Sequence, residues 1–455
     1  MRCRSHSLTS RKGGPPLDSG DTAFVLISAA MVMFMTPGLA LFYGGMVRAK
    51  NVLATVMQSF FTIGLVSVLW VLAAYSLAFG PDKGGLIGGL DYLGFRGVGQ
   101  APNPDLSPTI PHIAYAVFQL FFAAITPALI TGAFAERMKF SAFALFTTLW
   151  LFLVYAPLAH WVWAPGGWLR ELGALDFAGG TVVHMNSGFA ALAAAIVIGK
   201  RRGFLKEAIV PHNLTLTILG AGILWFGWFG FNAGSALAAN GLAATAFIAT
   251  NTATGAAVLG WCLTDYLRRR KTTTLGAASG AVAGLVAITP AAGYVGPMGS
   301  IAIGLAAGIV CALAVGIKYR AGYDDALDVV GVHAVGGMLG ALLIGVFANT
   351  AFNQAGADGL LAGGGFALLG KQALAVGATL VFSFVLSFAL LKLVDLLVGL
   401  RVTEEEELTG LDIAQHEEVG YAFAEGAGSM APVPAGYAQQ GGASATIRVP
   451  QGDSA

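Results

Sequence analysis

The chain has 455 residues, of which 56% are hydrophobic and only 11% are charged, and its formal net charge is +1. Soluble proteins carry about 25% charged residues, so this composition excludes an ordinary cytosolic enzyme and indicates a polytopic membrane protein. The near-zero net charge does not point to a nucleic-acid partner. The three cysteines, Cys3, Cys262 and Cys311, have neither disulfide nor metal-ligand spacing.

Nearly charge-free runs long enough to cross a bilayer, which takes about 20 apolar residues, recur along the chain. Seven have the length of a single span and cover residues 22–47, 51–81, 106–135, 140–169, 177–200, 329–357 and 372–391. Two more, 208–264 and 272–317, are twice too long for one helix and contain breaks at 234–241 and 292–300. We therefore predict an all-α membrane protein with eleven transmembrane helices.

The Lys and Arg residues of the connecting loops predict the orientation, because cytoplasmic loops carry an excess of them. Alternate loops hold fourteen of these residues, near 48–50, 137–139, 200–206, 268–271 and 318–320, whereas the loops between them hold four. We therefore expect a protein of the inner (plasma) membrane with its N-terminus outside and its C-terminus in the cytoplasm. The N-terminal tail contains four basic residues that would resist export, Arg2, Arg4, Arg11 and Lys12. The charge difference between the loops is larger, so we take the orientation from the loops.

The two ends differ from the membrane region in composition. Residues 1–20 lack the apolar core of a signal peptide, and we expect an extracytoplasmic tail there that is unprocessed or disordered. Residues 21–400 form the expected membrane domain. Residues 401–423 are rich in acidic side chains and are predicted to be an ordered cytoplasmic regulatory segment. Residues 424–455 are rich in Gly, Ala, Pro and Gln and are predicted to be disordered.

Two histidines inside uncharged spans share a sequence frame. His184 and His333 each follow a valine, with an aspartate eight residues before (Asp176, Asp325) and a glycine four residues after (Gly188, Gly337). An ionisable residue within a membrane span marks a functional site by default. The matching frames predict a duplicated helix whose two copies meet at one site.

The expected topology brings the two histidines towards each other from opposite sides of the membrane. At a rise of about 1.5 Å per residue, His184 and His333 should be separated along the membrane normal by on the order of 6–14 Å, a gap that helix tilt or side-chain reach can largely close. Spans 1–5 and 6–10 are then inverted repeats, followed by a long eleventh helix, with the site near the midplane. The alternative, in which each histidine satisfies its own core hydrogen bond, is disfavoured by the matched frame. No third ligand lies at metal spacing, so neither a metal nor another cofactor is expected.

Six strings carry a family resemblance. They are DTAFVLISAAMVMFMTPGLALFYGGMVRAKN from Asp21, FQLFFAAITPALITGAFAERMKFSA from Phe118, HWVW from His160, DFAGGTVVH from Asp176, GWFGFNAGSA from Gly227 and GVHAVGG from Gly331. Together they resemble the Amt/Mep/Rh ammonium transporters, specifically the bacterial Amt branch. The likeness runs from about residue 21 to residue 423 and includes GLRVTEEEELTGLD from Gly399. One departure is Ala334, which follows His333 where glycine is common.

The resemblance implies a homotrimer with one pore per subunit, and it assigns roles to individual residues. His184 and His333 are the twin histidines of the pore. Trp163 and Ser235, with a contribution from Phe118, form an outer site that recruits the substrate. Phe118 and Phe231 stack as a gate beneath that site. Trp163, Ser235 and Phe118 each lie at one end of a span, and the loop charges place all three of these ends outside the membrane.

Asp176 corresponds to the family's aspartate at the start of span five. Because it precedes the expected start of a helix, we favour a structural, helix-capping role for it over direct binding of the cation. Asp325 and Asp328 are expected to cap the tenth span in the same way.

The implied function is that of an ammonium transporter or channel, without enzymatic activity. A tryptophan face attracts a cation, whereas a bare cation in an apolar tube would cost tens of kcal/mol in the idealised limit. We therefore favour deprotonation of ammonium at the outer site, followed by passage of ammonia along neutral imidazoles, over passage of the bare cation. The released proton then either stays outside or moves separately. The expected partners are ammonium, methylammonium, membrane lipids and a PII-type (GlnK-like) regulator docked at 401–423.

Three alternatives remain. The chain could be an ammonium sensor (a transceptor) that signals to a PII-type protein, although its tail is short for a signalling domain. A membrane enzyme could use the histidine pair as acid and base, but no nucleophile is evident nearby. A Rh-like gas channel would lack the tryptophan of the outer site, so Trp163 favours the Amt reading.

Overall fold

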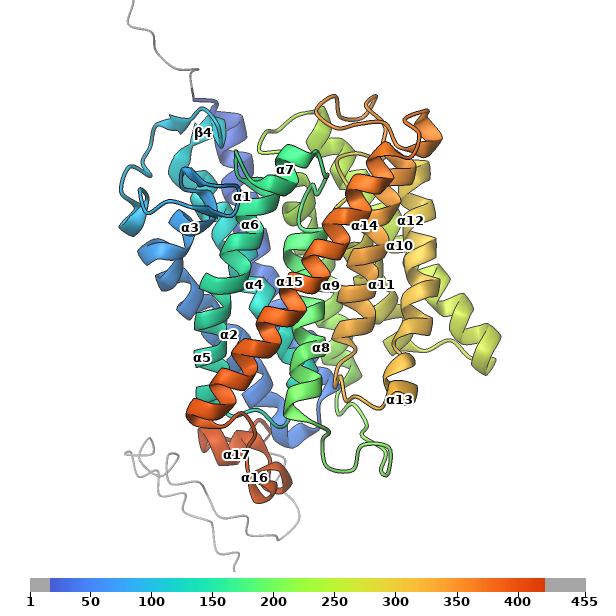
Figure 1. Cartoon of the computed structure of the whole chain (residues 1–455). Helices are drawn as coiled ribbons and strands as arrows, with labels where there is room; N and C mark the ends of the chain where they lie inside the picture. Colours follow the sequence, from blue (N-terminus) through green and yellow to red (C-terminus); the bar gives the residue numbers. More distant parts are fainter. Residues whose placement is uncertain (1–16, 422–455) are drawn as a thin grey trace, which may run out of the picture.

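The computed structural model describes residues 17–421. The tail expected at 424–455 and all but the last four residues of the tail expected at 1–20 lie outside the described residues. The chain forms an upright bundle of helices with short connections at its two ends (Figure 1). The helices form because nearly every long segment is apolar, and in a bilayer a helix satisfies all its backbone groups internally.

The first half of the bundle contains helices interrupted by single π-helical turns. Its elements are α1 (Ser19–Met46), η1 (Ala49–Asn51), α2 (Val52–Leu69), η2 (Trp70–Ala74), α3 (Tyr75–Phe79), α4 (His112–Phe134), α5 (Phe140–Trp150), η4 (Leu151–Tyr155), α6 (Ala156–Trp163), α7 (Trp168–Leu172), η5 (Gly180–Met185) and α8 (Asn186–Ile198). A small lobe between α3 and α4 holds η3 (Leu93–Phe95) and two hairpins, β1 (Asp82–Lys83) with β2 (Ile87–Gly88) and β3 (Pro102–Asn103) with β4 (Ser107–Pro111).

The second half follows the same plan. It contains α9 (Leu214–Gly234), α10 (Gly241–Arg269), α11 (Thr274–Ile288), α12 (Pro297–Ala314), α13 (Ile317–Ala321), η6 (Val330–Ala334), α14 (Val335–Phe347) and η7 (Leu360–Ala362), followed by α15 (Ala367–Val398), α16 (Glu404–Thr409) and α17 (Leu411–His416). Reciprocal packing joins the halves, because α8 packs against η6 while α14 packs against η5. The all-α fold is therefore as predicted.

Ten helices in the described part of the chain are long and apolar enough to cross a membrane. The expected eighth span, 272–292, contains α11, an apolar helix of only 15 residues, or about 22 Å. Its shortness fits its position, since its last two turns are buried inside the bundle. The expected third span also starts later than predicted, because residues 107–111 form β4 and the helix begins at His112. The prolines at 108 and 111 disfavour a helix there.

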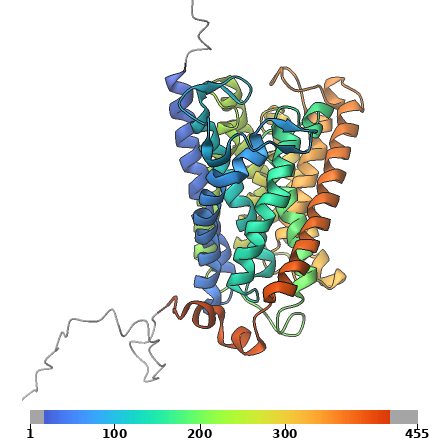
Figure 2. The same cartoon turned by 60° about the vertical axis from the view of Figure 1, so that its left-hand side comes forward.

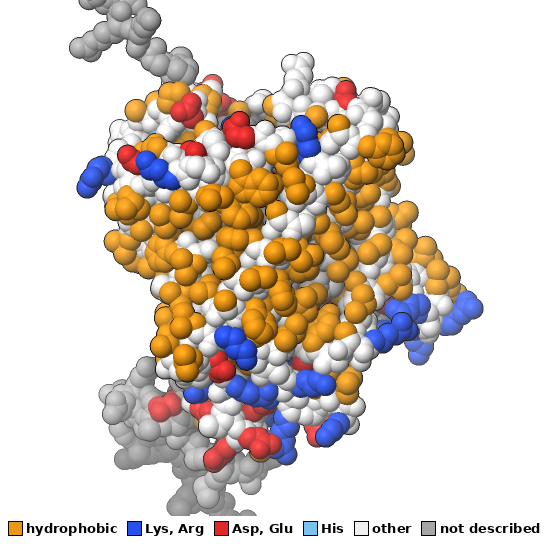
Figure 3. All heavy atoms as spheres, in the orientation of Figure 1, with side chains coloured by type: hydrophobic (Ala, Val, Ile, Leu, Met, Phe, Trp, Pro, Cys, Tyr) orange, Lys and Arg blue, Asp and Glu red, His pale blue; other side chains and the backbone are white. Residues whose placement is uncertain are grey.

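The long final helix α15 has 32 residues, or about 48 Å, and crosses the bundle diagonally (Figure 1). The ends of the bundle differ in charge. Helices α16 and α17 lie together at one end of the bundle (Figure 2). Lys and Arg side chains gather at that end, and a broad apolar band separates it from the other end (Figure 3).

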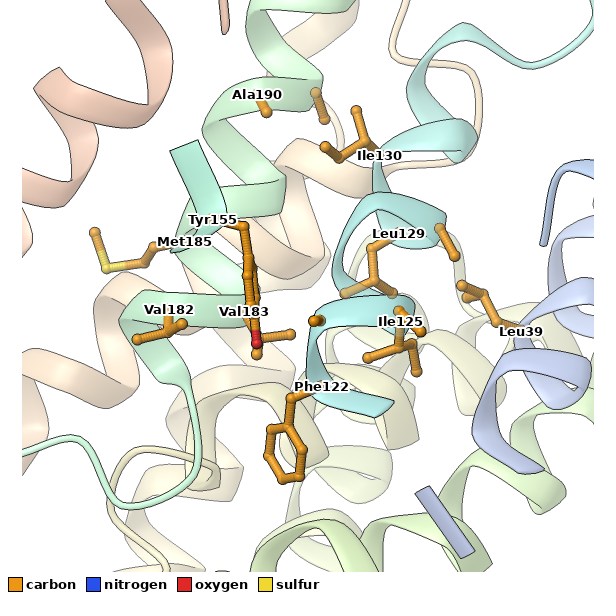
Figure 4. Close-up of a cluster of buried hydrophobic side chains, with 14 of the residues drawn as sticks. Leu39, Phe122, Ile125, Leu129, Ile130, Tyr155, Val182, Val183, Met185 and Ala190 are labelled. Carbon is orange, nitrogen blue, oxygen red and sulfur yellow. The ribbon is translucent and has the colours of Figure 1, made fainter. Parts of the chain in front are cut away.

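The core between α1, α4 and η5–α8 is apolar and closely packed. Figure 4 labels Leu39, Phe122, Ile125, Leu129 and Val183 among its members, and all are buried. This packing brings η5, which carries one of the two frame histidines, to the centre of the molecule.

Candidate functional site

His184 and His333 meet at the centre of the bundle. Their Nδ1 atoms lie 3.3 Å apart, their ring centroids are 5.4 Å apart with planes at 25°, and both side chains are buried. The rings are in direct contact, so the axial gap expected from helix geometry is closed. The expectation assumed helices from the membrane surface inwards, but η5 begins only at Gly180. Residues 174–179 before it are not helical, so the rise of about 1.5 Å per residue assumed for a helix does not apply to them.

The two frame aspartates bind the first turns of the histidine helices. Asp176 accepts hydrogen bonds from the backbone N–H groups of Gly179, Gly180 and Thr181 at 2.7–2.8 Å and from the Thr181 hydroxyl. Asp325 accepts from the N–H groups of Val329 and Val330 at 3.1 and 2.7 Å. These bonds satisfy donors that a helix start leaves unpaired, so both aspartates have the expected capping geometry. Burial raises the pKa of the Asp176 carboxyl and raises that of Asp325 to about 6.

Asp328 does not cap the tenth span, and that prediction is wrong. Its backbone has a left-handed conformation, with φ at 64°, and its carboxylate pairs with Lys318 at 2.6 Å. A residue in this conformation turns the chain just before the helix, which directs its side chain to a neighbouring helix end instead of the backbone donors.

The frame glycines allow the two histidine helices to cross closely. A Cβ on Gly188 would collide with the backbone of Ala334, and a Cβ on Gly337 would lie 3.1 Å from the Cβ of His184. Each glycine therefore packs beside the opposite histidine segment. All three elements of the frame have a physical role, because the aspartate starts the helix, the glycine lets the helices approach and the histidine occupies the crossing point.

A cavity of about 520 Å³ opens at the end of the bundle that carries the hairpins. It brings together Trp163, Ser235, Phe122 and Asp176 from four different segments. The Trp163 indole N–H donates to the backbone oxygen of Asp176 at 3.0 Å, which fixes the ring. The Ser235 hydroxyl donates to the carbonyl of Phe231 at 2.8 Å, so its oxygen lone pairs remain able to accept. Trp163 and Ser235 were predicted together at such a site.

Phe118 is not part of this cavity, and its predicted stacking on Phe231 is wrong. Phe231 stacks on Phe122 instead, with centroids 4.1 Å apart and planes at 26°. Phe118 lies four residues earlier on α4, about one helical turn away, and meets Phe122 edge-on at 4.9 Å. It packs towards Gly234, where an added Cβ would lie 2.9 Å from its ring. Helical spacing puts Phe118 and Phe122 on one face, so the sequence alone does not choose between them.

Below the stacked phenylalanines the aromatic groups continue to the histidines. His184 stacks on Trp228, with centroids 5.2 Å apart and planes at 16°, and lies 6.0 Å from Phe231. Trp228 donates its indole N–H to Thr289 Oγ1 at 2.7 Å. Sequence reasoning missed Trp228, although it lies three residues before Phe231 and so shares its helix face. Within residues 17–421, His184 Nε2 is buried without a hydrogen-bond partner.

The opposite end of the bundle is rich in paired charges. A second cavity of about 320 Å³ is lined by residues that include Arg201, Leu327 and Asp328. Arg201 bonds Asp324 at 2.9 Å and Glu136 at 3.3 Å. In the part of the chain that the structure describes, no group of three or more His, Cys, Asp or Glu side chains could hold a metal ion.

The fold and the site define a multi-pass membrane protein whose two halves meet at a buried histidine pair, next to an aromatic cavity at the end of the bundle that carries the hairpins. The model of the Ammonium Transporter Family matches residues 23–421, and the chain belongs to that family. Ammonium transport is therefore its function.

Two groups of relatives agree with this assignment. The chain is 54% identical over 406 residues to the ammonium transporter of Bacillus subtilis, covering 89% of this chain and 99% of the relative. It is similar to the crystal structure of Candida albicans Mep2, with a TM-score of 0.81, 35% identity and coverage of 86% and 88%. It is also similar to a structure described as a sensor Amt protein, with a TM-score of 0.79, 32% identity and coverage of 87% and 98%.

Proposed function

We propose that the protein recruits ammonium in the outer cavity, removes its proton there and conducts ammonia past His184 and His333. The histidine contact carries this proposal, because it joins two rings that can each be neutral at a point where the two histidine-bearing segments pack against each other. Trp163 would hold the cation through its aromatic face, a contact of about 0.5–2 kcal/mol, while Ser235 accepts one N–H bond.

The gate is assigned to Phe122 and Phe231. Their stacked rings separate the outer cavity from the histidines, so a solute must displace them to pass. A hydrated cation would lose water at this point, and no carboxylate has a hydrogen bond to either histidine ring among the described residues to replace it. Potassium is excluded because it has no proton to give up and the apolar rings cannot substitute for its water shell.

The histidine pair suits an uncharged solute that both donates and accepts hydrogen bonds. The free Nε2 of His184 is available to such a solute, and ammonia has both a lone pair and N–H groups. Trp163 also separates this proposal from a Rh-like gas channel, for which we expect no tryptophan at the outer site. Whether the released proton stays outside or follows by another route defines two forms of the same function.

The orientation and the assembly are part of the proposal. The end with α16 and α17, where Lys and Arg gather (Figure 3), is assigned to the cytoplasm, which leaves the hairpin lobe and the N-terminus outside the inner membrane. We assign a homotrimer, and a PII-type regulator as the partner of residues 401–423 and the basic loops. A sensor role is the alternative, supported by the likeness to the sensor Amt protein.

Current recording on reconstituted protein tests the transport mechanism. Ammonium, methylammonium and potassium are applied in turn while flux is measured in parallel by isotope or pH-sensitive dye. Flux of ammonium and methylammonium without flux of potassium is the expected result. A current in proportion to ammonium flux would mean that charge crosses, and silent flux that ammonia crosses alone. Equal permeation by potassium would overturn the proposal.

A further inference from the structure

Gln119, on α4, lines the outer cavity together with Trp163 and Ser235. It is 8% exposed. Its Nε2 donates to the Tyr115 hydroxyl at 3.3 Å, and its Oε1 is buried without a hydrogen-bond partner. Among the buried side-chain atoms of residues 17–421 that lack a partner, this oxygen is the one whose residue lines the outer cavity.

The position of Gln119 along α4 puts it between the mouth of the cavity and the gate. Helix α4 begins at His112, directly after strand β4 of the hairpin lobe, so Tyr115, Gln119 and Phe122 follow one another towards the centre of the bundle. Residues three or four positions apart share a helix face, and all three of these line the cavity. A solute that moves along this face towards Phe122 passes the amide of Gln119 about one turn earlier.

The hydrogen bond of Gln119 does not join it to another helix, because Tyr115 lies on α4 as well. Gln372 on α15 shows how a structural amide differs. Its Oε1 accepts the N–H of Leu175, and its Nε2 donates to the carbonyls of Leu175 and Ala341, so it ties α15 to two other segments. A buried acceptor without a partner is costly. The free oxygen of Gln119 in a cavity wall therefore indicates a ligand that donates hydrogen bonds.

The other acceptors of the cavity are partly occupied. The Asp176 carboxylate already accepts several hydrogen bonds from the first turn of the following helix. The Ser235 hydroxyl donates its own hydrogen to Phe231 and keeps its lone pairs. An ammonium ion has four N–H groups, and Ser235 alone satisfies one of them. Gln119 supplies a second uncharged acceptor, from a different helix.

We propose that Gln119 is a further substrate-binding residue: its side-chain oxygen accepts an N–H of the ammonium ion in the outer cavity, in addition to the bond to Ser235 and the contact with Trp163. Tyr115, which accepts from the amide nitrogen, orients this oxygen. The inference rests on the recruitment function proposed above and deepens it. Binding of the cation, and not its passage through the gate, is the step that weakens when the oxygen is removed.

Methylammonium uptake by proteoliposomes, measured as KM and kcat, tests the role of this oxygen. Gln119→Leu keeps a side chain of similar size without an acceptor, and its KM should rise about fivefold or more, because hydrogen bonds to charged groups are among the stronger ones. The kcat should change little. Gln119→Glu keeps accepting oxygens at the same place, and its KM should be no higher than that of wild type. The pair separates the acceptor from the volume of the side chain.

Two further variants control for effects on the fold. Thr379→Val removes another buried oxygen without a partner, on α15 and outside the lining of the outer cavity, and should leave KM unchanged. Gln372→Leu removes the structural amide and should lower the melting temperature in detergent, whereas Gln119→Leu should not. Gln119→Asn, whose amide is one methylene shorter, decides the question if the leucine variant does not fold, and its KM should also rise.

A wild-type KM in Gln119→Leu, or in Gln119→Asn where it replaces the leucine variant, would overturn the inference. An equal rise of KM in Gln119→Leu and Gln119→Glu would do the same, because the acceptor would then not matter. Trp163→Ala, measured in parallel, should raise KM as well. An unchanged KM for a folded Trp163→Ala, or wild-type protein without uptake, would instead overturn the recruitment function on which the inference rests.

Discussion

The Nδ1 atoms of His184 and His333 lie 3.3 Å apart, although the two residues are 149 positions apart in sequence and belong to the two halves of the bundle. A hydrogen bond between two Nδ1 atoms needs one N–H and one lone pair, so the two rings adopt opposite tautomers. One Nε2 then carries a proton and the other a lone pair. The pair therefore offers a passing solute both a donor and an acceptor.

Removing either ring should abolish this arrangement. His184→Ala is expected to lower methylammonium uptake by about tenfold or more, because the solute loses a hydrogen-bond partner in a buried, apolar site where unpaired polar groups are costly. Uptake of labelled methylammonium into proteoliposomes measures the effect, with the melting temperature in detergent as a control for folding. Unaltered uptake in a folded variant would instead favour an enzyme that uses the histidines as acid and base.

Phe122 and Phe118 provide a matched test of the gate. Phe122 stacks on Phe231, whereas Phe118 meets only the edge of Phe122 and packs away from the cavity. Phe122→Ala should admit potassium or abolish discrimination against it, measured as potassium flux relative to methylammonium flux. Phe118→Ala should cost about 3–5 kcal/mol of stability, as large core truncations do, but should keep the selectivity. If the two variants lose selectivity equally, the stack is not the barrier.

Acid should weaken the end of the bundle that carries α16 and α17 through Glu136 and Asp324. Burial opposes ionisation of Glu136, but its bonds to Arg48 and the charge of Arg201 outweigh burial, so its pKa lies below its ordinary value of 4.5. Burial is likewise outweighed at Asp324, mainly by its bonds to Arg201, and its pKa lies below 3.8. A lowered folded-state pKa gives stability that is present above the unfolded value and lost as pH falls through the folded value.

The melting temperature in detergent should therefore hold from about pH 7 to about pH 5 and fall below about pH 4. Glu136→Gln should lose about 3 kcal/mol at neutral pH, because it removes the buried carboxylate that pairs with both Arg48 and Arg201, and its melting temperature should depend less on acid. Glu171→Gln, at an exposed residue of α7, is the control. A wild-type melting temperature that rises on acidification would contradict the sign of both shifts.

The sequence predicted the central relationship because periodicity and spacing encode it. Asp176, His184 and Gly188 recur as Asp325, His333 and Gly337, and the structure gives each member a role: the aspartate begins the helix, the glycine allows the close approach and the histidine makes the contact. The depth of the histidines was not predictable, since the non-helical approach before Gly180 leaves no mark in hydropathy. The assignment of Phe118 to the gate was wrong, because Phe122, four residues later, shares its helix face and is the residue that stacks on Phe231 of α9.

The capping role predicted for Asp328 and the length predicted for the span that contains α11 differ from the structure for a related reason. A run of charged residues before an apolar span is typical of helix capping, and nothing local distinguishes Asp325, which caps, from Asp328, which turns the chain and pairs with Lys318. The short helix α11 was correctly located as an apolar segment. Its length depends on where the surrounding helices leave room, which is a property of tertiary packing.

The segment after α15 should detach when Asp412 is changed. Its carboxylate accepts the backbone N–H groups of Leu53 and Ala54 at 3.0 and 2.8 Å, and so caps the first turn of α2. Asp412→Ala removes a cap worth about 1 kcal/mol, and a glutamate-specific protease should then cleave within residues 404–407 faster than in wild type. Asp412→Asn keeps an accepting oxygen and should give an intermediate rate. Mass spectrometry of the fragments measures both, and equal cleavage of all three proteins would mean that Lys50, which bonds the carbonyls of Glu407 and Leu408, holds the segment without Asp412.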